Sequence, residues 1–310
     1  MSLHRLCLLG LWLGTLSLMM GGGCKQRQTE VVMPKLSPQL LDEVHAQRQA
    51  WRASQDARMR GPLSPLSRID YQHLPIGEHI LGDTATETVH LVPELRAGFV
   101  GELRVIVQPE EVSFVSTQPV LHNGEPQSRA SLHKGDTLLI GKALILLSGP
   151  PTDPGLAVYS ESAPSRLSYS GLHYYPDNDS LVVAAKLVRF APRKVKLLAS
   201  RGAPQELTAI GDLHFSIGQD CVLEAYLDSP TGNTLFLIFR DQTSGQPGGS
   251  YGAGRFLLAK LAADDTAVLD FNQAWNPLCA YSAFFHCPMP SRKNHLPVAI
   301  LAGEKSHGEH

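Results

Sequence analysis

Alternation of apolar and polar residues is clearest in Glu102-Leu103-Arg104-Val105-Ile106-Val107 and in Val112-Ser113-Phe114-Val115. Successive side chains of a β-strand point to opposite faces, so this alternation indicates strands with one buried face. Turn signals separate such runs at 82–83, 122–124 and 134–136. Their spacing predicts a small β-sandwich over residues 67–163.

A second strand-rich block is predicted at 164–305. We expect strands there at 181–190, 195–199, 211–217, 221–227, 234–239, 255–261 and 298–302. Short strands without a convincing helix between them favour a second β-barrel or sandwich. The predicted fold class is therefore mainly β, with an N-terminal helix, then a small β-sandwich, then a second β-barrel or sandwich domain.

One helix is expected ahead of both blocks, at 38–59, within a helix-and-linker segment that spans 38–66. Ser37 can cap it, and Leu40, Val44 and Trp51 lie on one face of the predicted helix. Gly61 and the proline after it end the helix. We expect Trp51 to anchor the helix by packing.

The first 23 residues have the features of an export signal. Residues 6–20 are apolar but shorter than a membrane span, and three glycines lead directly into Cys24. This arrangement resembles the lipobox of bacterial lipoproteins, in which that cysteine is lipidated. An ordinary cleaved signal with an incidental cysteine is the alternative. Polar residues 24–37 form the predicted tether, and residues 306–310 a C-terminal tail.

The charge composition argues against one class of protein, the nucleic-acid binders. The chain has 310 residues, with 27 Lys and Arg against 29 Asp and Glu, a formal charge of −2. Nucleic-acid binders need a cationic surface to displace counterions, so this balance argues against a nucleic-acid partner. An export signal and Lys25 after the cysteine lead us to expect a periplasm-facing protein in the cell envelope, anchored by lipid in the outer membrane.

A glycine-rich stretch between 239 and 255 is the first candidate for a binding site. Its glycines leave backbone N–H groups open to an anion, and Arg240 and Arg255 flank it. No Walker spacing follows, so it is not a nucleotide-binding P-loop. A plain hairpin connector with internal ion pairs is the competing interpretation.

The second candidate is the loop from Asp270 to Cys287, rich in residues that form side-chain hydrogen bonds to the backbone. Cys279 and Cys287 lie eight positions apart in this loop. A disulfide suits an oxidising periplasm; a nucleophilic thiol and inert buried thiols are alternatives. A metal site with His286 or His295 is a further alternative, but the spacing matches no common zinc pattern, so no metal or cofactor is predicted.

We expect both stretches to enclose one polar pocket that binds a small anionic ligand, because functional side chains concentrate on connectors between strands. The candidate ligand-binding residues are Arg240, Asp241, Thr243, Tyr251, Arg255, Asp270, Asn272, Asn276, Tyr281 and Glu304. Replacing Arg240 or Arg255 should then abolish binding and leave melting unchanged. A hydrolase with Asp270 or Glu304 as general base is one alternative, and an architectural protein that binds an envelope partner is another.

Two family resemblances accompany these motifs. The stretch 270–281, with Cys287-Pro288, 294–298 and 302–305, resembles the domain-of-unknown-function family 1684. The resemblance extends to 239–245, to 251–255 and, upstream, to Trp51-Arg52 and Ser64-Pro65-Leu66, so that it covers nearly all of 45–305. It implies no reaction, and relatives without export signals imply that the thiol pair can stay reduced.

The second resemblance concerns the first β block alone. The turn at Asn123-Gly124 and the pattern over 132–141 resemble the forkhead-associated sandwich, which binds phosphothreonine. The phosphate-reading residues of that family are replaced by Ala97-Gly98-Phe99-Val100-Gly101. We therefore expect a structural sandwich without phosphopeptide binding.

Overall fold

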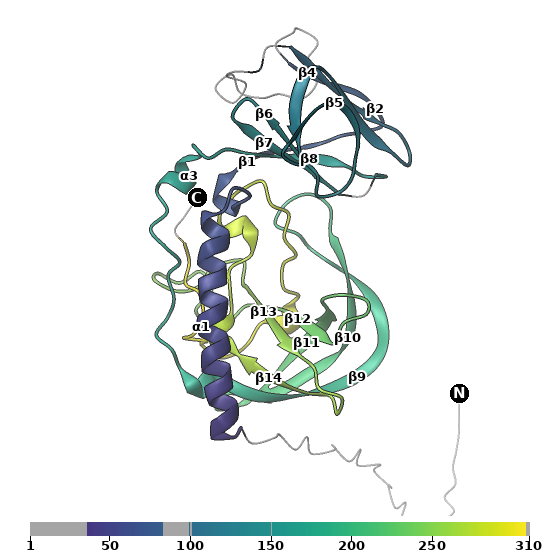
Figure 1. Ribbon diagram of the computed structural model, residues 1–310. Helices are drawn as coiled ribbons and strands as arrows, with labels where there is room; N and C mark the ends of the chain where they lie inside the picture. Colours follow the sequence, from purple (N-terminus) through teal and green to yellow (C-terminus); the bar gives the residue numbers. More distant parts are fainter. Residues whose placement is uncertain (1–35, 83–98, 100, 150, 308–310) are drawn as a thin grey trace, which may run out of the picture. The chain divides into compact units, whose positions relative to one another are not determined.

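The computed structural model describes residues 36–82, 99, 101–149 and 151–307, which belong to one compact unit of the chain. It contains helix α1 and two antiparallel sheets (Figure 1), so the predicted fold class is confirmed. The predicted export signal, Cys24 and all but the last two tether residues lie outside the described residues. So do Ala97, Gly98 and Val100 of the second resemblance and the end of the tail.

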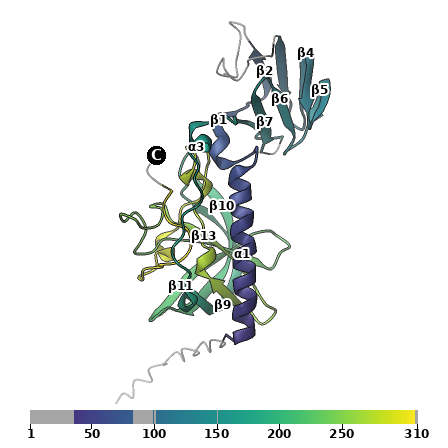
Figure 2. The same cartoon turned by 60° about the vertical axis from the view of Figure 1, so that its left-hand side comes forward.

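Helix α1 spans Pro38–Arg60, as the sequence predicts. The Ser37 hydroxyl caps it by accepting a hydrogen bond from the Leu40 N–H at 3.2 Å. Val44, Arg48 and Met59 are its buried residues. Figure 2 shows the helix running alongside strands of the second sheet. The buried face thus carries an arginine among apolar residues, which needs an acidic partner.

The first sheet holds eight strands in the order β1-β8-β7-β6-β4-β3-β2, with β5 paired to β4. It curls into a half-barrel around an apolar core that includes Leu103, Val105, Phe114 and Ile145. Its strands are β1 (Arg68–His73), β2 (Gly77–Gly82), β3 (Glu102–Val107), β4 (Val112–His122), β5 (Glu125–Leu132), β6 (Thr137–Ile140), β7 (Ala143–Ser148) and β8 (Gly155–Tyr159).

The Asn123-Gly124 turn joins β4 and β5, and both of its residues have positive φ, 49° and 89°. The Asn123 amide donates to Asp136 at 2.9 Å, and its oxygen accepts from the Thr137 N–H at 2.9 Å. Although partial burial opposes ionisation, hydrogen bonds from the Asn123 amide, the His133 N–H and the His122 ring lower the pKa of Asp136 to about 2. The motif thus has a structural role, and likeness to the forkhead-associated sandwich stays a prediction.

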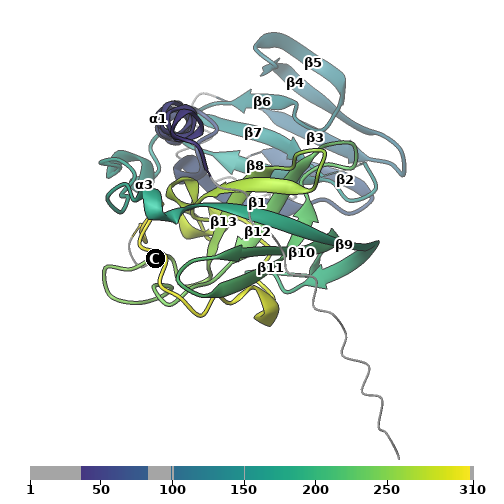
Figure 3. The same cartoon turned by 90° about the horizontal axis from the view of Figure 1, so that it is seen from below.

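The second sheet is a nearly closed barrel of six strands in the order β13-β12-β11-β10-β9-β14 (Figure 3). A hairpin between β13 and β14, with a bridge from Leu261 to Ala267, brings the two edge strands together. The strands are β9 (Val182–Leu197), β10 (Gln205–Ser216), β11 (Asp220–Leu227), β12 (Thr234–Phe239), β13 (Arg255–Lys260) and β14 (Thr266–Asp270). Short helical turns complete the fold: η1 (Pro65–Ser67), α3 (Pro164–Leu167), η2 (Asp179–Leu181), η3 (Phe271–Gln273), η4 (Leu278–Ala280) and η5 (Arg292–Asn294).

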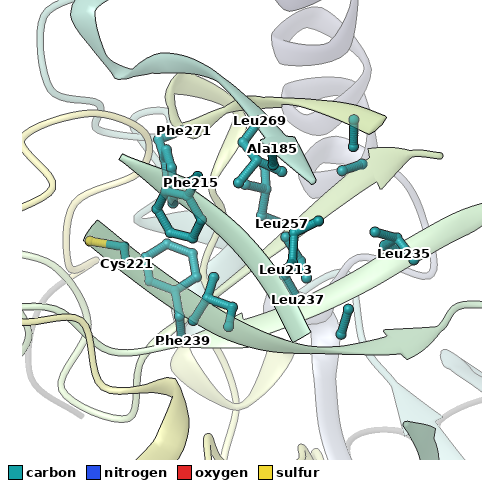
Figure 4. Packing of buried hydrophobic residues seen from close by; sticks show 14 of the residues in the cluster. Ala185, Leu213, Phe215, Cys221, Leu235, Leu237, Phe239, Leu257, Leu269 and Phe271 are labelled. Atoms are coloured by element: carbon teal, nitrogen blue, oxygen red, sulfur yellow. The ribbon is translucent and has the colours of Figure 1, made fainter. Parts of the chain in front are cut away.

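Part of the barrel wall, as at β12, is buried on both faces. Inside, Phe271 packs on Phe215 and Phe239 with ring centroids 5.6 and 5.4 Å apart (Figure 4). Outside, the next residue along a strand enters a second cluster, as Ile238 does after Leu237. The loop after β14 covers this outer cluster with Trp275, Leu278, Cys279, Phe285 and Cys287. The barrel therefore places the 270–287 loop firmly against its wall.

Three details differ from the predicted strands. Residues 298–302 form no strand, because the carbonyls of Ile300 and Ala302 accept from the Arg255 guanidinium instead of a neighbouring strand. The predicted break near Pro192 is a bulge within β9: its register with β10 shifts between Arg189 and Arg193. Proline has no N–H to donate and fits such a gap in the ladder. Strand β14 was not predicted.

Candidate functional site

Arg255 and Asp241, two of the predicted ligand-binding residues, pair with each other in the interior. Both side chains are 0% exposed, and Arg255 Nη2 donates to Asp241 Oδ2 at 2.8 Å. The same guanidinium donates to the backbone oxygens of Ile300, Ala302 and Glu304. Asp241 also accepts from the Thr243 N–H at 2.8 Å. The pair therefore holds the 300–304 segment against β13 and presents no free charge to a ligand.

Glu304, Tyr281 and Asn276, three further predicted residues, form a second buried cluster. The Tyr281 hydroxyl donates to Glu304 Oε1, and the Asn276 N–H donates to Oε2 at 2.9 Å. The Glu304 side chain is 1% exposed, and burial raises its pKa to about 7, although these hydrogen bonds act in the opposite direction. Neither Glu304 nor Tyr281 lines a described cavity, so the geometry does not offer Glu304 as a general base.

This burial predicts a pH dependence of stability. A carboxyl group whose folded pKa of about 7 lies above its ordinary 4.5 binds more protons in the folded state between those values. The free energy of unfolding should therefore fall as pH rises from about 4.5 to 7, by roughly 3 kcal/mol from this group. We expect Glu304→Gln to flatten that decline in urea titrations at pH 5 and 8. Glu206→Gln, at an exposed position of β10, is the control and should keep the decline of stability with pH. An unchanged decline in Glu304→Gln would contradict the assignment.

Asp270 lies at the end of β14 and is paired with Arg48 of α1. Arg48 Nε and Nη2 donate to the two carboxylate oxygens at 3.0 and 3.2 Å, a bidentate contact in which the side chains are 2% and 6% exposed. Asn272 donates to Asp270 at 2.7 Å and also pairs with the backbone of Asn178. Asp270 and Asn272 thus position α1 and the 177–179 segment. Asp270 also borders a hollow of about 440 Å³ between α1 and β13–β14.

A larger cleft of about 950 Å³ does join the glycine-rich stretch to the 270–287 loop. Of the ten predicted ligand-binding residues, Tyr251 lines it. Its other lining residues are His173, Tyr174, Gly245, Gln246, Pro247, Gly248, Gly249, Ser250, Gly252, Cys279, Ala283, Lys305 and Ser306. The two stretches therefore share a cleft, as the sequence predicts, but with different side chains on its walls.

Two predicted residues remain, Thr243 and Arg240, and neither lines this cleft. Thr243 is buried and its hydroxyl is 2.8 Å from that of Ser250, a lining residue. Arg240 is half-buried, its backbone pairs with His295, and within the described part of the chain its guanidinium makes no ion pair. Arg240 borders none of the cavities described above. Neither predicted arginine therefore supplies positive charge to the cleft.

Lys305 supplies that charge, although the sequence predicted no ligand role for it. Its ammonium lies 5.4 Å from the Tyr175 ring centroid, and no acidic side chain pairs with it among the described residues. The N–H groups of Gly248 and Gly252, in the glycine-rich stretch, have no hydrogen-bond acceptor among the described residues. Arg48 and His173 were also missed, since Arg48 lies 222 positions from Asp270 and nothing local marks either residue.

The two cysteines of the 270–287 loop lie close together, and Cys279 lines the cleft. Both are free thiols in the structure, and the Cys279 N–H lies 3.3 Å from Cys287 Sγ. A disulfide between them stays a prediction. Within the described ranges, no group of three or more His, Cys, Asp or Glu side chains is placed to hold a metal ion. Nor does any helix in those ranges combine the length and apolarity of a membrane span.

Comparisons with known proteins concern the barrel region. Residues 167–305 match a family model described as "Protein of unknown function (DUF1684)". The solution NMR structure of an uncharacterized protein from Haloarcula marismortui is 32% identical, over 47% of this chain and 81% of that chain, with a TM-score of 0.40. The search of curated proteins found no match. Through residues 167–305, which contain the barrel, most of the cleft lining and both Cys279 and Cys287, the chain belongs to the DUF1684 family.

Proposed function

We propose that this chain is a lipid-anchored protein of the cell envelope whose barrel binds a small anionic ligand in the cleft between the glycine-rich stretch and the 270–287 loop. The observation that carries the binding proposal is the charge of the lining. Lys305 and His173 border the cleft, and no Asp or Glu is among its described lining residues. An anion placed there meets an ammonium group without a competing carboxylate.

The backbone of the glycine-rich stretch supports the same ligand class. Gly245 and Gly248 have positive φ, 79° and 67°, which L side chains rarely adopt. The stretch turns tightly, with Gly249 N–H bonded to the Gln246 oxygen at 2.8 Å. The neighbouring N–H groups of Gly248 and Gly252 stay available, and such groups bind anions in many proteins. The ligand is therefore expected to carry a carboxylate or a phosphate.

Lys305→Met tests the charge. We expect inorganic phosphate or citrate to bind the wild-type chain in isothermal titration, and the substitution to weaken binding about 10- to 100-fold, since a hydrogen bond to a charged group contributes about 1.5–3 kcal/mol. Lys196→Met, on an exposed position of β9, is the matched control and should bind as the wild type does. Equal binding by Lys305→Met, or no binding of either anion to the wild type, would refute this site.

Lipid anchoring is proposed from the lipobox-like sequence at Cys24. Metabolic labelling with a palmitate analogue should mark the wild-type chain and a Cys7→Ala control, and should fail with Cys24→Ala. The labelled chain should sediment with outer-membrane fractions, because Lys25, not Asp, follows the cysteine. Label that persists in Cys24→Ala would exclude this anchor, whereas sedimentation with the inner membrane would exclude the proposed location.

A further inference from the structure

The thiols of Cys279 and Cys287 differ in their surroundings although they are neighbours. Cys279 is half-buried and lines the cleft, whereas Cys287 is 6% exposed and packs in the outer apolar cluster of the barrel. The Cys279 thiol lies within hydrogen-bond reach of the Cys287 thiol, of Ser200 and of Tyr251. Cys279 thus lies at the cleft wall, and Cys287 lies in the apolar cluster next to it.

These hydrogen bonds make the thiol of Cys279 acidic. The hydrogen bond from the Cys287 thiol, with smaller contributions from Ser200 and Tyr251, lowers the pKa of Cys279 to about 6 against the opposing effect of burial. The same hydrogen bond and burial raise the pKa of Cys287 well above its ordinary value. Among the described residues, Arg68 lies near enough to Cys287 to interact with it electrostatically. Cys279 is therefore the more acidic thiol of the pair.

We propose that Cys279 and Cys287 form a thiol–disulfide exchange site, in which Cys279 attacks a disulfide that enters the cleft and Cys287 resolves the product. The assignment rests on geometry: Cys279 is partly exposed and lines the cleft, and the sulfur of Cys287 lies 3.3 Å from the Cys279 backbone nitrogen. Its substrate class is a small disulfide, R–S–S–R. It does not depend on the anionic ligand proposed above.

The exchange balances without a further reactant. The Cys279 thiolate attacks one sulfur of the disulfide, a mixed Cys279–S–S–R bond forms, and RS⁻ leaves. Cys287 then gives its proton to solvent, and its sulfur attacks Cys279 Sγ, so that the second RS⁻ leaves. The two protein thiols are oxidised to one disulfide, and one R–S–S–R is reduced to two RSH. Excess RSH reverses both steps.

The test uses the full chain and the neutral reagent bis(2-hydroxyethyl) disulfide, so that binding of an anion plays no part. After quenching with iodoacetamide, mass spectrometry follows tryptic peptide 261–292, which contains both cysteines, and peptide 202–240, which contains Cys221. We expect the wild-type peptide 261–292 to lose two hydrogens at least 10-fold faster than Cys221 reacts. Cys221 is the internal control, because it is 2% exposed and burial raises its pKa.

Two variants separate the roles of the thiols. Cys287→Ser should accumulate a stable adduct on Cys279, and Cys279→Ser should react at least 10-fold more slowly than the wild type. Equal reaction by Cys279→Ser, or a wild-type chain that keeps the adduct without forming an internal disulfide, would overturn the proposal. So would a folded wild-type chain that does not react; this measurement needs no variant and therefore stands if a substitution impairs folding.

Discussion

Replacing Arg255 with methionine is expected to lower the free energy of unfolding by about 3–5 kcal/mol. The substitution leaves the Asp241 carboxylate, 0% exposed, without its cationic partner. It also removes the donors to the backbone oxygens of Ile300, Ala302 and Glu304. Methionine fills much of the volume, so the loss reports unpaired polar groups more than a cavity. Urea unfolding followed by tryptophan fluorescence measures the change.

Arg189→Met is the matched control, because Arg189 lies in the same barrel and pairs with Asp265 at the surface. These side chains are 52% and 30% exposed, so the control should change stability by no more than about 1 kcal/mol. Adding Asp241→Asn to Arg255→Met should restore part of the loss, since the buried charge is then gone. If Arg255→Met lowers the free energy of unfolding by less than about 1 kcal/mol, the buried ion pair is not what stabilises this region. Arg255 would then again be a candidate ligand residue, as the sequence predicts.

Arg48→Met is expected to cost about 3 kcal/mol and to loosen α1 from the barrel. Arg48 is the bidentate partner of Asp270, and its Nη1 also donates to Asp177 at 3.1 Å. Without it, Asp270 keeps the hydrogen bonds from Asn272 and Gln273 but loses its charge partner. Amide hydrogen exchange across 38–60 should accelerate more than exchange in β10–β12.

Tryptophan emission gives a second measurement of the same change. Trp51 of α1 lies 6.2 Å from Trp275 between ring centroids, so loosening the helix should expose both indoles and shift their emission to longer wavelength. Arg58→Met, on an exposed turn of α1, should leave exchange and emission unchanged and stability within about 0.5 kcal/mol. Arg48→Met with wild-type exchange in α1 would show that the ion pair does not hold the helix.

The sequence predicted those parts of the fold that local patterns encode. The cap at Ser37, the stop at Gly61 and the alternation at 102–107 each act through neighbours in the chain, and all three are present. The prediction went wrong where a distant partner decides the structure. Residues 298–302 are apolar enough for a strand, but the guanidinium of Arg255 takes their carbonyls.

In the candidate site, too, the features set by local sequence could be predicted and those set by distant partners could not. That the glycine-rich stretch and the 270–287 loop share a cleft was predicted from their residue types, and Tyr251 and Cys279 line it. Which charges face the cleft could not be predicted. An arginine beside a glycine-rich loop has the same local sequence whether it binds a ligand or a buried aspartate such as Asp241. The pairing of Arg48 with Asp270 spans most of the chain and leaves no local signal.

The eight-stranded sheet is inserted between two parts that belong together, since α1 precedes it and its partner Asp270 follows it. Its two ends meet: β1 pairs with β8, and the Ser160 N–H donates to the Ser67 oxygen at 2.8 Å. The residues at which the chain enters and leaves this sheet are therefore joined by a hydrogen bond. Such a module can be excised, exchanged or enlarged during evolution without altering the path from helix to barrel, and a reporter domain could be grafted there by the same route.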